Sequence, residues 1–175
     1  MGIPRDTEVG MGTLVSRRSL LLSGVAAGGL LAAGGGIRWA RQPAAGALVL
    51  SQPEHEVVEA AARVLFPPGF FPVSGGDGKT APEVDRILAQ VIDPRAVAPF
   101  RTMLGALEWG TLVSRGNRFS QLTPAEATHV LDVWGSENPF PRRVAFDSLQ
   151  AVIGMAFLRR PEVLEAVDWR TGCFG

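Results

Sequence analysis

Residues 144–158 read VAFDSLQAVIGMAFL, and this stretch decides the fold. It is the longest run in the chain whose apolar residues recur at the three- and four-residue spacing of an α-helix. From position 151 to position 158 the sequence is apolar on nearly every side, which is typical of a helix buried inside a protein. The stretch therefore predicts a central, buried helix around which the other segments pack.

Three further helices are predicted to begin at capping boxes. In a capping box, a Ser or Thr side chain accepts a hydrogen bond from the amide three residues later, and a Glu at that later position bonds back to the first amide. Each of the three boxes also holds a proline in the first helical turn, where no amide hydrogen bond is lost. The pairs are Ser51 with Glu54, Thr80 with Glu83, and Thr123 with Glu126.

Two more helical segments complete the predicted bundle. One starts at Asp93 and Pro94 and ends near Gly116, and Pro99 is expected to break or kink it. The other is a short final helix over 162–168. No segment alternates apolar and polar residues at the period of a β-strand. We therefore expect residues 48–175 to form a single all-α domain, a compact bundle of about five or six helices.

The first 47 residues are interpreted as an export signal that precedes this domain. Arg17 and Arg18 stand before an uncharged run over 19–37 that is built largely from Gly, Ala and Leu. A basic segment followed by an apolar one is typical of export signals, and the adjacent arginine pair indicates the twin-arginine route. Residues 45–47 read Ala-Gly-Ala and offer a cleavage site. The alternative is a retained membrane anchor, because the run is about long enough to span a bilayer.

Composition excludes several kinds of function. The chain has 17 Lys and Arg and 17 Asp and Glu, so nothing indicates a surface for nucleic acid. Cys173 is the single cysteine, so this chain can build neither an intramolecular disulfide nor a cysteine-based metal cluster. No glycine-rich dinucleotide motif follows a strand pattern, and we expect no cofactor to bind to this chain itself.

Three local patterns are candidate sites. Residues 75–80, GGDGKT, resemble a phosphate-binding loop, but Val73 stands where that motif needs a glycine, so a solvated turn is favoured. His55 and His129 lie beside acids without the spacing of a metal site, so surface positions are favoured over a metal-dependent enzyme. Phe70 and Phe71 are adjacent aromatics in a loop rich in Pro and Gly, and they are candidates for a partner interface.

Five short motifs occur in a fixed order along the chain. They are LFP at 65–67, RFSQLTPAE at 118–126, Trp134, RRVAF at 142–146, and PEVL at 161–164 leading to Trp169. In this order they resemble the gluconate 2-dehydrogenase subunit 3 family, the small subunits of membrane-bound flavin dehydrogenases that act on sugars and other alcohols. The resemblance covers most of the chain from about residue 51 to residue 169.

The resemblance implies a subunit without catalytic residues of its own. In such complexes a large FAD-binding subunit of the glucose-methanol-choline (GMC) type performs the oxidation, and electrons pass to a cytochrome c subunit or another acceptor. The small subunit binds the large one in the cytoplasm and escorts it through the twin-arginine translocase to the periplasm or to the periplasmic face of the membrane. A free-standing exported helical binding module is the alternative from a different functional class.

Overall fold

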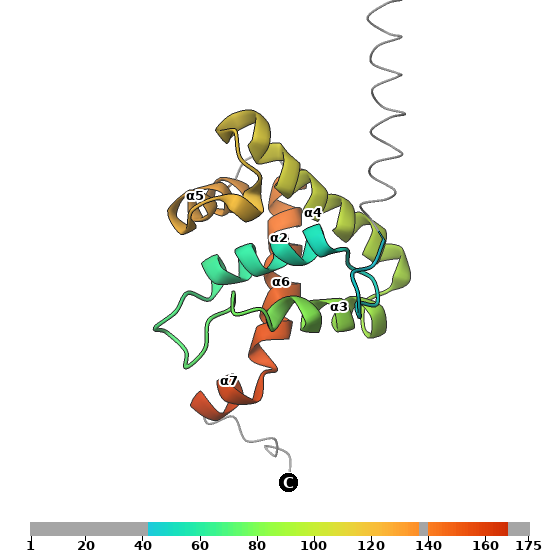
Figure 1. Cartoon of the computed structure of the whole chain (residues 1–175), viewed down its shortest axis with the longest axis vertical. Coiled ribbons are helices and arrows are strands. Elements are labelled where there is room, and N and C mark those ends of the chain that lie inside the picture. Colours follow the sequence, from blue (N-terminus) through green and yellow to red (C-terminus); the bar gives the residue numbers. More distant parts are fainter. Residues whose placement is uncertain (1–41, 137–139, 168–175) are drawn as a thin grey trace, which may run out of the picture. The chain divides into compact units, whose positions relative to one another are not determined.

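The computed structural model describes residues 42–136 and 140–167. Arg17, Arg18, the uncharged run over 19–37, Trp169 and Cys173 lie outside these residues. The described part contains six α-helices and no strand, so the predicted all-α fold is confirmed (Figure 1). In chain order the elements are α2 (Gln52–Leu65), α3 (Thr80–Gln90), α4 (Pro94–Arg115), the 3-10 turn η1 (Phe119–Gln121), α5 (Pro124–Gly135), α6 (Phe140–Leu158) and α7 (Pro161–Ala166).

Two of the three predicted capping boxes form. At the start of α2 the Glu54 carboxylate accepts a hydrogen bond from the backbone amide of Ser51 at 2.7 Å. At the start of α5 the Glu126 carboxylate accepts one from the amide of Thr123 at 3.0 Å, and the Thr123 hydroxyl accepts one from the amide of Glu126 at 3.4 Å. A cap of this kind is worth about 1 kcal/mol, so the local sequence is enough to place both helix starts.

The capping box predicted at Thr80 is wrong. Thr80 is already the first residue of α3, and its hydroxyl donates to the carbonyl oxygen of Gly75 in the preceding loop. Glu83 pairs with Arg86 one turn later in the helix. The amide of Ala81 donates instead to the carboxylate of Glu59 on α2, at 2.7 Å. A carboxylate from another helix therefore takes the role that the local pattern assigned to Thr80 and Glu83.

The break expected at Pro99 is also absent. Helix α4 runs without interruption from Pro94 to Arg115 and ends at Gly116, whose left-handed φ of 76° closes the helix as predicted. Pro99 lies on the exposed side of α4 near its start. The carbonyl one turn earlier that loses its amide partner belongs to Arg95, which is exposed and can be hydrated.

Helix α6 is the central helix of the fold, as its sequence predicts. It packs against α2, α3, α4, α5 and α7, and Figure 1 shows it passing behind α2. Its core residues are Leu149, Val152, Ile153 and Ala156. However, the helix is not buried all round, because its neighbours leave Met155 and Leu158 each more than a third exposed. The apolar sequence over 151–158 thus covers both a core face and a face open to solvent.

Buried carboxylates tie the helices to one another and to the segments between them. Glu54 of α2 accepts hydrogen bonds from Nε and Nη2 of Arg101 on α4, each at 2.9 Å. Glu108 of α4 accepts from the amide and the hydroxyl of Ser120 in η1, at 2.9 and 2.7 Å. Asp85 of α3 holds the segment that leads into α2, through three backbone amides. Hydrogen bonds to charged acceptors are among the stronger ones in proteins.

Candidate functional site

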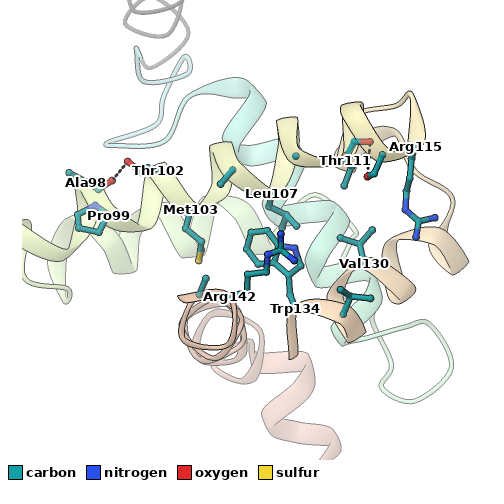
Figure 2. Close-up of a pocket in the computed structure, with 15 residues that line it drawn as sticks. Ala98, Pro99, Thr102, Met103, Leu107, Thr111, Arg115, Val130, Trp134 and Arg142 are labelled. Atoms are coloured by element: carbon teal, nitrogen blue, oxygen red, sulfur yellow. Dashed lines mark hydrogen bonds between the residues drawn. The ribbon is translucent and has the colours of Figure 1, made fainter. Parts of the chain in front are cut away.

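An open groove of about 910 Å³ runs along α4 and is a candidate site in the described part of the chain. One side of the groove is α4 itself, and the other side is formed by α5 and the first turns of α6 (Figure 2). Its lining is mainly apolar, with the side chains of Met103 and Leu107 from α4 facing Val130 and Trp134 from α5 (Figure 2). The open form suits part of a protein partner, because small-molecule pockets of similar volume enclose most of their ligand.

Small residues form the α4 side of this groove. They occur at every fourth position, all of them exposed: Ala98, Thr102, Ala106, Gly110 and Ser114. Positions four apart lie on one face of a helix, so the small side chains form a continuous shallow row. A Cβ atom added to Gly110 would meet nothing within 4 Å, which shows how open the row is at that point. Another helix could approach the α4 backbone closely along this row.

Two arginines add positive charge to the apolar groove. Arg115 stands at the end of α4, and Arg142 lies at the start of α6 (Figure 2). Neither makes an ion pair with another residue of the described part of the chain. Arg115 acts only weakly on Glu126, whose pKa is lowered mainly by the hydroxyl of Thr123. The groove therefore combines apolar surface with two guanidinium groups that are available to a carboxylate.

The two candidate interface aromatics lie in different surroundings. Phe71 is partly buried, with its ring centroid 5.3 Å from that of Phe157 and 6.3 Å from that of Phe66. Phe70 is 82% exposed and contacts Phe71 edge-on, at 5.3 Å between centroids. Phe71 thus belongs to an aromatic cluster that fixes the loop, whereas Phe70 is displayed on the surface. The structure does not bring either residue into the α4 groove.

The loop that resembles a phosphate-binding motif already holds an anion from the chain itself. The Glu59 carboxylate accepts hydrogen bonds from the amides of Gly78 and Ala81, at 3.0 and 2.7 Å. Amides in a loop before a helix are the groups that bind phosphate in nucleotide sites. The Asp77 carboxylate in the same loop is bound by Arg160. The exposed positions 77–79 agree with the solvated turn that was predicted, whereas Gly75 and Thr80 at its two ends are buried.

The two histidines do not meet. His129 is exposed on α5, while His55 of α2 is half-buried, and its Nε2 atom is a buried polar atom without a hydrogen-bond partner. Within the described residues, no three His, Cys, Asp or Glu side chains gather closely enough to hold a metal ion. The structure gives the histidines no shared site for a metal-dependent reaction.

The motif over 118–126 has a structural role in this fold. Phe119 is fully buried, Ser120 is held by Glu108, and Glu126 caps α5. The Arg118 guanidinium lies 3.8 Å from the same Glu108 carboxylate. These residues, which support the resemblance, build the turn that leads from α4 into α5.

Sequence analysis missed the α4 groove and the role of Asp85. The signal for the groove is present in the sequence as small residues four apart between positions 98 and 114. Comparison of the chain with protein-family models, with curated proteins and with solved structures yields no match. None of the helices within 42–136 and 140–167 is both long and apolar enough to cross a membrane.

Proposed function

We propose that this protein is the non-catalytic small subunit of an FAD-dependent dehydrogenase of the GMC type, acting on sugars or other alcohols. The flavin subunit binds to it in the cytoplasm, and the signal with Arg17 and Arg18 carries the pair through the twin-arginine translocase to the periplasm. FAD and the oxidation chemistry belong to the partner, and a cytochrome c subunit is the candidate electron acceptor. The α4 groove is the observation in the structure that carries the proposal.

The groove has the properties expected of a surface for a protein helix. Its row of small residues allows close approach, and the partly exposed side chains of Met103, Val133 and Trp134 supply apolar area to be covered. The guanidinium groups of Arg115 and Arg142 favour a partner helix that carries Asp or Glu beside its apolar face. The occupant we assign to the groove is such an amphipathic helix of the flavin subunit.

The resemblance and the arginine pair support the same assignment from the sequence. The twin-arginine route transports proteins that have already folded, so a subunit bearing the signal can carry a partner that lacks one. We expect no cofactor to bind to this chain itself, which fits a subunit that bears the signal for a cofactor-binding partner. The partner's chemistry is inferred from the five ordered motifs, which resemble the gluconate 2-dehydrogenase subunit 3 family.

Co-purification from the native host tests this function. The full chain with a C-terminal tag should elute with a large subunit and with the absorbance spectrum of a flavin. Replacing Arg17 and Arg18 by Lys should remove both proteins from the periplasm, because the translocase no longer accepts the signal. A colourless single protein that is exported alone would contradict the proposal and would favour a free-standing binding module.

A matched pair of variants tests the groove. Ala106→Arg places a long charged side chain on the row of small residues, whereas Val113→Arg places the same side chain on the same helix at a site that is 94% exposed and outside the groove. Both positions are exposed, so both variants should fold. We expect Ala106→Arg to reduce recovery of the flavin subunit at least about tenfold, a change of about 1.4 kcal/mol in binding. Equal recovery with both variants would show that the partner binds elsewhere.

A further inference from the structure

Asp85 carries a buried negative charge that no cation in the described part of the chain neutralises. Asp85 is 3% exposed, and its carboxylate accepts hydrogen bonds from three backbone amides. The amide of Leu48 donates to Oδ2 at 2.6 Å, while those of Val49 and Leu50 donate to Oδ1 at 2.9 and 2.6 Å. No salt bridge among the described residues includes Asp85. A buried carboxylate without a counter-ion is unusual, because burial of an unpaired charge is costly.

The first of these donors is the nitrogen of the peptide bond at which the predicted signal ends. The Ala-Gly-Ala pattern at 45–47 places the cleaved bond between Ala47 and Leu48. This bond lies in a turn that is closed by hydrogen bonds from the amide of Ala47 to the carbonyl of Ala44 and from the amide of Ala44 to the carbonyl of Leu50, both at 2.9 Å. Leu48 is 56% exposed, and exposed turns are preferred sites of proteolysis.

We infer that cleavage of the Ala47–Leu48 bond gives Asp85 its counter-ion. Hydrolysis adds one water molecule: its oxygen becomes part of the new carboxylate of Ala47, and its two hydrogens convert the Leu48 amide nitrogen into an α-ammonium group. The nitrogen atom that becomes this group already lies 2.6 Å from Oδ2 of Asp85, so the product is a new, partly buried ion pair. The signal is removed, and the mature domain begins with a terminus that is locked onto α3.

Several features of the surroundings favour this ion pair. The nitrogen is in place before cleavage, so little rearrangement is required to form the pair. Val49 and Leu50 continue to donate to the other carboxylate oxygen, which satisfies the acceptor that the ammonium does not use. A buried ion pair gains most when hydrogen bonds satisfy the remaining oxygen atoms, as they do here. Leu50 is fully buried beyond these contacts and holds the segment in the core.

This inference rests on the predicted export signal but not on the identity of the partner. The chain with a C-terminal tag is recovered from the periplasm of the native host, and its intact mass identifies the first residue. We expect a chain that starts at Leu48. A chain that is exported with another first residue, or with its signal retained, would overturn the inference.

The reactivity of the new terminus tests the ion pair itself. The α-amine of the exported protein is labelled with a limiting amount of an acid anhydride at neutral pH, and the rate is compared with that of the peptide Leu-Val-Leu-Ser-Gln. We expect the protein amine to react at least about tenfold more slowly, because the carboxylate favours its protonated, unreactive form. Equal rates in the folded protein and the peptide would overturn the inference.

A comparison of two forms separates the ion pair from simple hydrogen bonding. Asp85→Asn is made in the exported chain and in a chain with Arg17 and Arg18 replaced by Lys, which keeps its signal. The loss in Tm should be greater by several degrees in the exported form, since only that form contains the ammonium. Equal losses would contradict the inference. If the Asn variant does not fold, the labelling of the wild-type amine still decides. Export and cleavage without a flavin partner would count against the proposed function alone.

Discussion

Arg160 holds the carboxylate of Asp77 with both terminal nitrogens, at 2.9 and 2.7 Å, although 83 positions separate the two residues. Arg160 is 6% exposed, and its guanidinium carbon lies 5.6 Å from the centre of the Phe157 ring. Nη1 also approaches the carbonyl oxygen of Ser74 at 3.4 Å. This ion pair connects the loop between α2 and α3 to the turn between α6 and α7. The position of the loop therefore depends on a turn that comes much later in the sequence.

Replacement of Asp77 by Asn should destabilise the domain by about 2 kcal/mol, because a buried guanidinium loses its nearer, bidentate carboxylate partner and keeps only Glu162 at 3.9 Å. The free energy of unfolding in urea measures the effect. Asp147→Asn is the matched control, since Asp147 pairs with Arg143 one turn away on the same helix and both side chains are about half exposed. We expect less than about 0.5 kcal/mol for the control. Similar losses for both variants would contradict a structural role for the Asp77 pair.

The contribution of the Asp77 pair should depend on pH. The hydrogen bond from Arg160 is the main cause that lowers the pKa of Asp77 from its ordinary value of 3.8. A carboxyl group with a lowered folded-state pKa stabilises the protein fully above the unfolded-state value, and this stability is lost as pH falls through the folded-state value. The difference in unfolding free energy between wild type and Asp77→Asn should therefore be constant near pH 7 and shrink below about pH 4. A difference that stays constant in acid would show that the charge of Asp77 is not involved.

Two glycines should respond in opposite ways to replacement by Ala. A Cβ atom on Gly75 would lie 2.2 Å from the carbonyl oxygen of Ala62, so Gly75→Ala should cost about 2 kcal/mol or more. A Cβ atom on Gly110 of α4 would meet nothing, and Gly110→Ala should stabilise the helix by about 0.5–1 kcal/mol. Thermal unfolding of the two variants is sufficient to compare them. A stable Gly75→Ala variant would mean that the loop does not need its close approach to α2.

Phe70 and Phe71 should separate binding from stability. Phe71→Ala removes a ring from the aromatic cluster with Phe66 and Phe157, and we expect a loss of about 2 kcal/mol in unfolding free energy. Phe70→Ala should change stability by less than about 0.5 kcal/mol, because the ring is mostly exposed. If Phe70 is an interface anchor, its removal should weaken recovery of the partner in the co-purification described above. Unchanged recovery would limit the interface to other surfaces.

The local chemistry of the sequence predicts most of the helices but not all of their ends. Ser51 with Glu54 and Thr123 with Glu126 act within one turn, so a short stretch of sequence contains everything that is needed. The start of α3 depends on Glu59, which lies 22 positions before Ala81 and cannot be recognised from the neighbouring residues. The exposed face of α6 depends in the same way on which helices pack against it.

The candidate site was harder to predict than the fold. Phe70 and Phe71 were predicted as interface residues because adjacent aromatic residues in a loop can be recognised from the sequence. A groove depends on the space between helices, which the sequence does not specify locally. Ala106 and Gly110 have no reactive or charged group that would identify them as site residues. They line a groove only because the fold places Trp134 on its opposite side. The hydrogen bond from the amide of Leu48 to Asp85 could not be predicted for a similar reason, since the two residues are 37 positions apart.

The central place of α6 also sets the order of events during synthesis. Helix α6, with its core residues Leu149 and Ile153, is translated after all the helices that it packs against except α7, so the core cannot close until most of the domain has been synthesised. At roughly 5–20 residues per second, the arginine pair emerges on the order of ten seconds earlier. In the proposed function, a targeting factor would therefore meet the proposed signal while the domain is still open. A factor that ensures folding before the proposed export must act within that delay or shield the signal until folding is finished.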